Sequence, residues 1–379
     1  MEEDMRQRIH MSRQDVETAQ AANPDANFSV MSPFSMLTKD EFSTKVLNSY
    51  VKGDKAKAKT TMKDQMGSGS VKPASSAFDK TANKADLTGA DSYSFSNNPA
   101  AQSPVAQTTS APNTPCPTTA PPMTPAPTPA PTPAPKPTTR APVVEPVTTQ
   151  PVANTPAATE KGISSNGNGV DWASTVCMSP VQSQGQCGSC WAFASVAAVE
   201  SLQCIKYGWE STNKFSEQQL VGCDTQNWGC SGGAPVYAFE YIQQQGLCSE
   251  SAYPYAMSEG GSASCSASCS KSKTGITGYE HLDSGDESGL IKALKSHPVV
   301  GAVASGNAAW KQYTGGVMSS CETTDLDHAV LVVGYDDSVL KVRNSWGKNW
   351  GEAGYVRMKR STSGTGTCGL LTDMSYPKI

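Results

Sequence analysis

The sequence predicts an α+β protein whose helices and strands occupy separate parts of the chain. Stretches rich in small apolar residues that are typical of helices lie between residues 190 and 245, and short β-branched runs broken by Gly, Asp and Asn lie between 328 and 358. A Pro/Thr-rich tract separates this region from a charged N-terminal one. We therefore expect three parts, which cover residues 1–52, 53–165 and 166–379.

The first of the expected helices runs from Cys190 to Lys206 and ends near Gly208. A second helix is expected to begin after Ser216, whose hydroxyl is a favourable N-cap. The third is expected from Ala234 to Gln245. The strands are expected over 328–335, 339–344 and 355–358, and we predict that they pair antiparallel.

The Pro/Thr/Ala tract over residues 101–160 dominates the middle part, 53–165. Such a composition cannot bury enough apolar surface to fold, so we expect a disordered, semi-extended polyproline II linker. Eleven of the twelve cysteines lie beyond it, in the globular part. Without tight metal-finger spacing they indicate disulfides and an oxidising compartment.

The composition also limits function. The net charge is −4 and the basic residues form no cluster, so we expect no nucleic-acid partner. No apolar run approaches the roughly 20 residues of a membrane span. Residues 1–20 lack an apolar signal segment, which conflicts with the cysteines. We give the cysteines more weight, and expect a true start upstream of Met1 and a secreted or lysosomal/vacuolar location.

The segment 184–195 places Cys190 at the start of the first helix. Partial positive charge at a helix N-terminus favours a thiolate, and the unpaired N–H groups of the first turn can bind an oxyanion. Taken alone, Cys187-x-x-Cys190 also fits a redox pair or half a zinc site. The arrangement Cys187-Gly188-Ser189-Cys190-Trp191 is a local signature of papain and cathepsin proteases.

A thiol nucleophile needs a base and a group that orients it. Of the four histidines, His328 alone opens an apolar strand, where an imidazole is held rigidly. Alternation turns Asn344 inward with the apolar residues of its strand, where an imidazole N–H would satisfy its oxygen and Trp346 could cover the bond. We place His281 in a polar loop, and expect it and His297 at the surface.

The motifs around Cys190, His328 and Asn344 follow one another in the order typical of the papain family. Residues 169–379 therefore resemble the cathepsin L-like cysteine endopeptidases of that family. Further landmarks are Val170-Asp171-Trp172, Ser216-Glu217-Gln218, Cys230-Ser231-Gly232-Gly233, Tyr253-Pro254-Tyr255, Trp350-Gly351-Glu352 and Gly354-Tyr355. The resemblance implies a papain-like two-lobed fold, with the active-site cleft between a helical lobe and a β-barrel-like lobe. It implies Cys190 as nucleophile, His328 as acid and base, Asn344 as orienting group, and Gln184 with the Cys190 N–H as oxyanion hole.

The resemblance also implies the residues that bind substrate. Gly232 and Gly233 would pair with an extended peptide, and Asp327 and Trp346 would border the cleft. The pocket for the P2 side chain would be lined by Ala234, Pro235, Ala302, Leu326, Ala329 and Asp373. This lining suits Leu or Phe, and Asp373 would add tolerance of Arg; the alternative is a solvent-facing aspartate.

Four disulfides follow from the resemblance, in addition to a thiol at Cys190. They are Cys187–Cys230, Cys223–Cys265, Cys248–Cys269 and Cys321–Cys368, although Cys265 and Cys269 could exchange partners. Cys177 and Cys204 remain, and their pairing stays open. We expect no metal and no cofactor.

Residues 1–52 resemble part of the family's inhibitory propeptide. Asn27-Phe28-Ser29-Val30, Phe34 to Thr38 and Glu41-Phe42 match its strand and short helix. Met36 stands where the family prefers aspartate and the first propeptide helix is missing, so inhibition in cis stays open. The alternative is an amphipathic segment with no function.

The expected function is therefore a monomeric cysteine endopeptidase, made as a zymogen, that cleaves proteins and peptides through a thioester at Cys190. The alternative is a catalytically silent papain-fold protein that binds partners from a Thr/Pro stalk. The intact set of Gln184, Cys190, His328 and Asn344 argues against this alternative.

Overall fold

A computed structural model describes residues 2–47, 50–53, 169–266, 268–361 and 364–379. All of these residues belong to one compact unit formed from Met1–Gly69 and Ala153–Ile379. Apart from Gly53, the expected linker over 53–165, with Cys116, lies outside the described residues. Among the described residues, no helix is long and apolar enough to cross a membrane.

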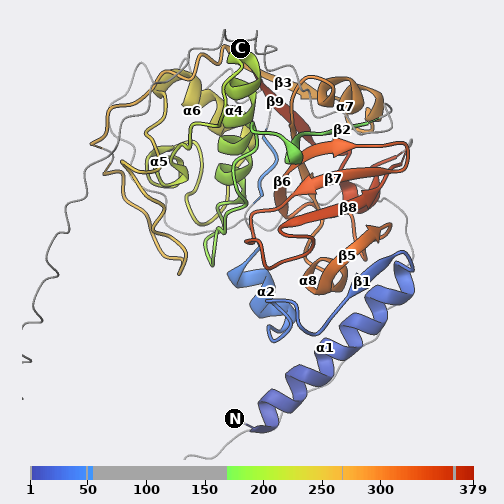
Figure 1. The fold of residues 1–379 in the computed structure, drawn as a ribbon. Coiled ribbons are helices and arrows are strands. Elements are labelled where there is room, and N and C mark those ends of the chain that lie inside the picture. The colour runs from blue at the N-terminus through green and yellow to red at the C-terminus, as the bar shows by residue number, and fades with distance from the viewer. Residues whose placement is uncertain (1, 48–49, 54–168, 267, 362–363) are drawn as a thin grey trace, which may run out of the picture. The chain divides into compact units, whose positions relative to one another are not determined.

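The helical half is built around α4 (Cys190–Tyr207), which lies between α5 and α6 on one side and the strands on the other (Figure 1). Its small residues let neighbours approach on all sides, and it is buried from Cys190 to Cys204. The helix α5 (Glu217–Cys223) begins after Ser216, whose hydroxyl accepts the Gln219 N–H, and α6 is Pro235–Gln245. The three predicted helices are thereby confirmed.

The strand half is a sheet in the order β1-β5-β8-β7-β6-β4-β9-β3, with β2 also paired to β6. Its strands are β1 (Ala26–Phe28), β2 (Val170–Asp171), β3 (Gly278–Leu282), β4 (Val299–Val303), β5 (Tyr313–Met318), β6 (His328–Tyr335), β7 (Val339–Arg343), β8 (Tyr355–Lys359) and β9 (Met374–Lys378). The strands predicted over 328–358 are confirmed, and their pairing is antiparallel. The β5–β8 pair is parallel.

Short helices cover the sheet's ends: the 3-10 turns Trp172–Ser174 and Thr367–Gly369, α7 (Glu287–Leu294) and α8 (Ala308–Gln312). Every residue of the central strand β6 is buried, because β4 and β7 flank it and α4 packs against it. This burial on both faces explains why its sequence is a continuous apolar run rather than an alternating one.

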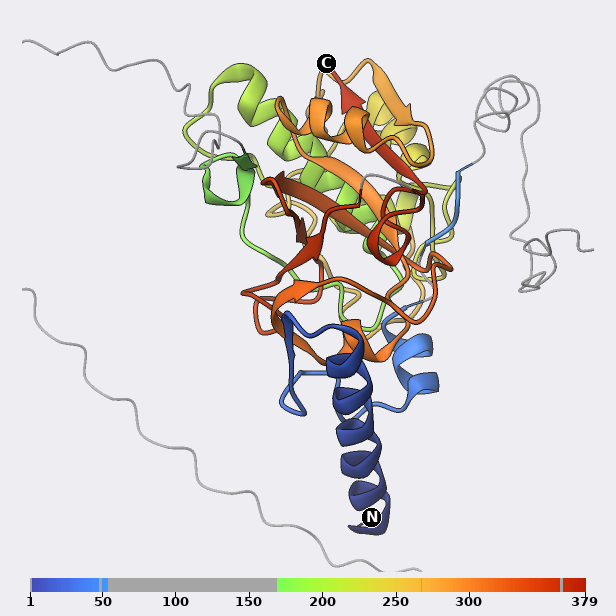
Figure 2. The same ribbon diagram turned by 90° about the vertical axis from the view of Figure 1, so that its right-hand side faces the viewer.

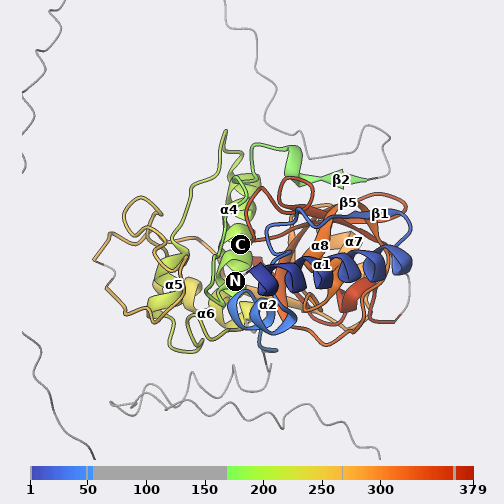
Figure 3. The same cartoon turned by 90° about the horizontal axis from the view of Figure 1, so that it is seen from below.

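The N-terminal segment packs against the same unit. The helix α1 (Glu2–Ala22) runs along α8, as Figures 2 and 3 show, and the Lys311 ammonium lies 2.7 Å from the Asp15 carboxylate. Strand β1 adds to the sheet edge by antiparallel pairing with β5. The helix α2 (Lys39–Lys45) begins with a capping box between Thr38 and Glu41.

One expectation about the strand half is wrong. The residues around His281 form β3, an edge strand paired along its length with β9, and not a polar loop. His281 is half-buried, as is His297, so neither lies free at the surface. The pairing of β3 with β9 joins segments almost a hundred residues apart, which local patterns do not reveal.

Candidate active site

Cys190 is the first residue of α4 and is fully buried. The backbone N–H of Ala329 lies 3.1 Å from its sulfur, so a strand of the other half reaches the thiol. Cys190 takes part in none of the five disulfides. The helix N-terminus and this N–H both favour negative charge on the sulfur.

The Gln184 side chain is held in one orientation beside this helix start. Its Oε1 accepts a hydrogen bond from the Ser345 hydroxyl at 2.6 Å. Its Nε2 therefore faces the other way, and donates to the carbonyls of Cys187 and Val46 at 3.1 and 3.2 Å. The Val46 carbonyl of the N-terminal segment thus accepts a hydrogen bond from the amide that the sequence predicts as a donor to the oxyanion.

His328 and Asn344 meet because β6 and β7 are antiparallel, which puts the start of one strand beside the end of the other. The Nε2 atom of His328 lies 2.7 Å from Asn344 Oδ1, an acceptor that requires the proton on Nε2. Trp346 stacks on the imidazole with ring centroids 4.7 Å apart. Both side chains of the pair are buried.

An aromatic cluster seals this pair from water. Trp310 contacts both His328 and Trp346, and Trp350 stacks on Trp310 at 5.6 Å. Phe34 and Phe42, from the N-terminal segment, both pack edge-on against Trp346 and are tilted relative to each other. This burial lowers the pKa of His328 to about 4, a shift that the bond to Asn344 only partly offsets. At neutral pH the imidazole is therefore uncharged in this structure.

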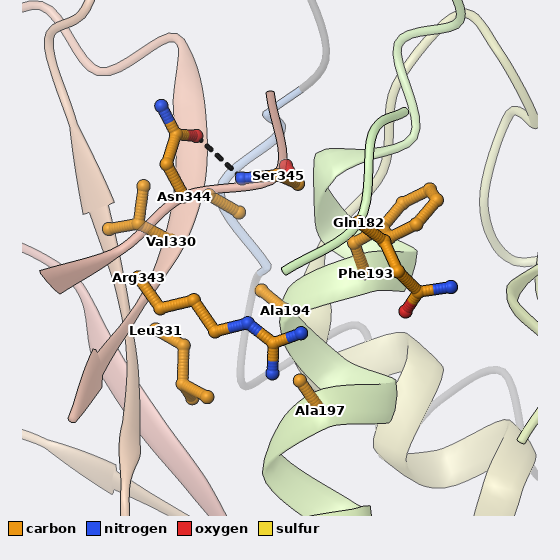
Figure 4. A pocket seen from close by; sticks show the side chains of 10 residues that line it. Gln182, Phe193, Ala194, Ala197, Val330, Leu331, Arg343, Asn344 and Ser345 are labelled. Atoms are coloured by element: carbon orange, nitrogen blue, oxygen red, sulfur yellow. Dashed lines mark hydrogen bonds between the residues drawn. The ribbon is translucent and has the colours of Figure 1, made fainter. Parts of the chain in front are cut away.

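Behind the pair, a small internal pocket lies between α4 and strands β6 and β7 (Figure 4). Arg343 reaches across it toward α4 and donates to the Pro180 carbonyl at 2.7 Å. Alternation sets Arg343 on the face opposite Asn344, and the structure shows that this face is covered too, since Arg343 is buried. Asn344 and Ser345 line the same pocket.

The predicted glycine pair contacts the N-terminal segment. Tyr50 forms a parallel bridge with Gly233, and the Val51 N–H donates to the Gly233 carbonyl at 2.9 Å. A Cβ on Gly233 would come within 2.7 Å of the Trp191 ring and closer still to Asn227, so only glycine fits. Gly232 accepts the Trp228 N–H and closes the turn.

The predicted P2 pocket is only partly assembled as expected. Pro235 and Asp373 line a pocket together with Tyr50, Gly53, Val236, Val300, Gly301 and Ser375. Ala302 and Ala329 are opposite each other in the β4–β6 ladder, and Ala234 caps α6 and is buried. Leu326 is half-buried beside Gly369.

Asp327 is half-buried, and its carboxylate bonds to the loop that follows β4. Its carboxylate accepts the N–H groups of Ser305 and Gly306 at 2.7 and 2.8 Å, and also the Ser305 hydroxyl. Burial raises its pKa, although these bonds act against the shift. The contacts fix the turn that precedes His328.

Two histidine environments were missed from the sequence. His281 lies 2.7 Å from Asp373, and their side chains are 12% and 9% exposed. The Asp373 carboxylate also accepts the Tyr50 hydroxyl. His297 instead packs on Tyr376, and burial lowers its pKa. No local sequence pattern predicts the His281–Asp373 pair, because it depends on the pairing of β3 with β9.

The ten other cysteines among the described residues form five disulfides. They are Cys177–Cys204, Cys187–Cys230, Cys223–Cys265, Cys248–Cys269 and Cys321–Cys368. Because Cys187 is bonded to Cys230, the C-x-x-C spacing does not close on Cys190. Within the described part of the chain, no three His, Cys, Asp or Glu side chains are grouped to hold a metal ion.

Residues 167–378 match the family described as "Papain family cysteine protease". Vignain of Ricinus communis is 42% identical over 220 residues, which cover 55% of this chain and 59% of that protein. The cysteine endopeptidase RepA of Oryza sativa subsp. japonica is 44% identical over 222 residues, which cover 55% of this chain and 56% of that protein. The chain thus spans less than two thirds of the length of these relatives.

Solved structures show the same fold. A cysteine protease of Carica candamarcensis in complex with E-64 is 37% identical, with a TM-score of 0.53, over 56% of this chain and 98% of that one. The ragweed pollen cysteine protease Amb a 11 in its proform is 35% identical, with a TM-score of 0.51, over 60% and 68%. These similarities confirm the two-lobed α+β fold predicted from the sequence.

Proposed function

The chain belongs to the papain family of cysteine proteases, and we propose that it cleaves peptide bonds in proteins as a cysteine endopeptidase. One observation carries the proposal. Cys190 opens a helix at the meeting point of both halves, where the Gln184 amide and the His328–Asn344 pair also lie. This arrangement supports the roles of nucleophile, base, orienting group and oxyanion donor that we propose for Cys190, His328, Asn344 and Gln184.

The chemistry follows from the atoms left available. Asn344 holds Nε2 of His328, and in the described structure Nδ1 is buried without a hydrogen bond. Nδ1 is then the atom that takes the proton of Cys190 and returns it to the leaving amine. The thiolate attacks the substrate carbonyl, and its oxygen becomes an oxyanion facing Gln184 Nε2 and the Cys190 N–H. Water then hydrolyses the thioester, with His328 as base.

We also propose that residues 1–52 inhibit this site in cis. The Val46 carbonyl takes the Gln184 donor, and Tyr50 and Val51 take the Gly233 backbone. A substrate needs the same groups, so both cannot bind together. Phe34 and Phe42 of the segment pack against Trp346, which stacks on the imidazole, and in this buried state the pKa of His328 is lowered to about 4. A neutral His328 does not stabilise the thiolate, so the segment suppresses the nucleophile as well as access to it.

Five disulfides support a site of action in an oxidising compartment, which we propose is extracellular or vacuolar. The proposed substrates are proteins and peptides that enter the cleft in extended form, and the proposed active unit is a monomer.

Labelling with an epoxide inhibitor of thiol proteases tests the proposed activity. The full chain is incubated with the inhibitor before and after acid treatment, and the labelled residue is identified by mass spectrometry. We expect little label before treatment, one label on Cys190 afterwards, and none in Cys190→Ala. A folded, treated chain that takes no label and cleaves no peptide contradicts the proposal and favours the catalytically silent alternative.

A further inference from the structure

Asp373 lines the pocket that Tyr50 also lines, and it pairs with His281, which stands behind it on β3. His281 Nε2 lies 2.7 Å from Asp373 Oδ1, and both side chains are about nine-tenths buried. The backbone fixes the pair, because β3 sets His281 opposite Ser375 and Asp373 directly precedes β9. One carboxylate oxygen therefore has a permanent donor behind the pocket.

The second oxygen receives a donor from the occupant of the pocket. Tyr50 is held at the rim by its backbone bridge to Gly233, and its hydroxyl donates to Asp373 Oδ2. Its ring shares the pocket with Pro235 and Val236. The N-terminal segment therefore displays the kind of side chain that fits: a flat apolar body that ends in one hydroxyl.

The bonds that the two Asp373 oxygens already accept favour some P2 side chains over others. A guanidinium binds a carboxylate best through two parallel N–H···O bonds, which need both oxygens. His281 already donates to Oδ1, so a guanidinium would have to share that oxygen, whereas Oδ2 takes the single donor of Tyr50. A phenol needs one acceptor and fills the apolar part of the pocket, whereas arginine would bury a charge that the pair leaves incompletely matched.

We propose that His281 is a specificity-determining residue, which with Asp373 makes this pocket select tyrosine and exclude arginine at P2. The inference rests on the proposed endopeptidase function and deepens it. It is narrower than the sequence-based expectation for Asp373, which admitted arginine. On this assignment the P2 preference depends on His281 together with Asp373, and not on Asp373 alone.

The test uses the full chain after acid treatment, with active sites counted by epoxide titration. Peptide substrates differ only at P2, which is Tyr, Phe, Leu or Arg. We expect kcat/KM about tenfold higher for Tyr than for Phe, because a buried hydrogen bond to a carboxylate is gained, and the lowest value for Arg. Equal values for Tyr and Phe, or Arg as good as Tyr, would overturn the assignment.

Variants separate His281 from general effects on the fold. In His281→Leu, Oδ1 is released, so the Arg-to-Phe ratio should rise about tenfold while the preference for Tyr over Phe persists. His281→Gln keeps a donor and should keep the original profile. Adding Asp373→Asn to His281→Leu should abolish the gain for Arg. As control, His297→Gln alters another half-buried histidine, which bonds to the Pro298 carbonyl, and should change no ratio.

A measurement that needs no catalysis keeps the two proposals apart. In the full-length Cys190→Ala chain, Tyr50→Phe deletes only the hydroxyl on Asp373 and should make the N-terminal segment leave at a lower urea concentration. The same change in a His297→Gln background should have an equal effect. Absence of titratable thiol in the parent chain contradicts the endopeptidase proposal alone, whereas an unchanged urea midpoint for Tyr50→Phe contradicts the assignment of the pocket.

Discussion

At the scale of single residues, the fixed orientation of the Gln184 amide supports its proposed role as a donor to an oxyanion. Ser345 holds its oxygen, so the nitrogen can only point into the cleft, where a carbonyl of the N-terminal segment meets it. A donor fixed before the reaction needs no reorganisation when the oxyanion forms. The same logic applies to His328, whose ring is fixed by Asn344 on one edge and by Trp346 on one face.

Gln184→Ala should lower kcat/KM by about a hundred- to a thousandfold, the usual cost of one oxyanion donor. The measurement is peptide hydrolysis normalised to epoxide-titrated active sites, so that a loss of folded enzyme is not counted. Gln186→Ala is the matched control, because Gln186 lies two residues away and is exposed. A Gln184→Ala enzyme with undiminished turnover would remove this residue from the mechanism.

The sequence could predict single residues where the evidence is local. Cys190 follows from a helix start, and Asn344 from alternation in a strand that ends at Arg343. The His281–Asp373 pair could not be predicted, because it depends on the register of β3 against β9. The burial of Arg343 was missed for a related reason, since alternation tells which face a side chain takes but not whether that face is covered.

At the scale of elements, strand β1 is the clearest link between the N-terminal segment and the rest of the unit. It pairs with β5, where Gly316 has φ of 81°, and a Cβ there would lie 2.4 Å from the Asp25 carbonyl oxygen. The helix α2 is also tied down, because Arg8 forms an ion pair with Glu41 of its capping box. The ion pair thus ties α2 to α1, and Phe42 of α2 packs edge-on against Trp346 of the rest of the unit.

Gly316→Ala should loosen the segment, because the new methyl group collides with backbone that only the segment provides. We expect faster epoxide labelling of the untreated full chain, by severalfold, with little change in kcat/KM after acid treatment. Gly364→Ala controls for the backbone cost, since Gly364 has φ of 67° but nothing within 4 Å of its Cβ. Equal labelling rates for the two variants would show that β1 does not hold the segment in place.

At the scale of the whole molecule, the covered state is coupled to pH through His328. Burial lowers the pKa of this imidazole from 6.5 to about 4. Below its ordinary pKa the imidazole is cationic in the unfolded chain, and it must lose its proton when folding buries it. Relative to the unfolded chain, the folded and covered state therefore has the full contribution above pH 6.5 and loses it as the pH falls toward 4. The whole difference corresponds to about 3 kcal/mol.

We expect the full-length Cys190→Ala chain, which cannot process itself, to release its N-terminal segment with a midpoint between pH 6.5 and 4. Tryptophan fluorescence reports the release, because Phe34 and Phe42 leave the Trp346 ring. The Arg8–Glu41 pair does not supply this transition, since it lowers the pKa of Glu41 to about 2. Replacing His328 with Gln in the same background should remove the transition, and a transition that persists would assign it to other groups.

Release of the N-terminal segment also leaves strand β5 as a bare edge, and bare edges are where sheets of different molecules join. At Gly316, the backbone N–H and carbonyl of β5 already have hydrogen-bond partners that oppose such joining. Its N–H is bonded to the Glu352 carboxylate at 2.9 Å, and its carbonyl to the Tyr313 hydroxyl at 2.8 Å. Neither bond involves β1, so both survive its departure. Without β1, the edge of β5 would therefore offer a neighbouring molecule an interrupted row of backbone donors and acceptors, which should disfavour edge-to-edge pairing.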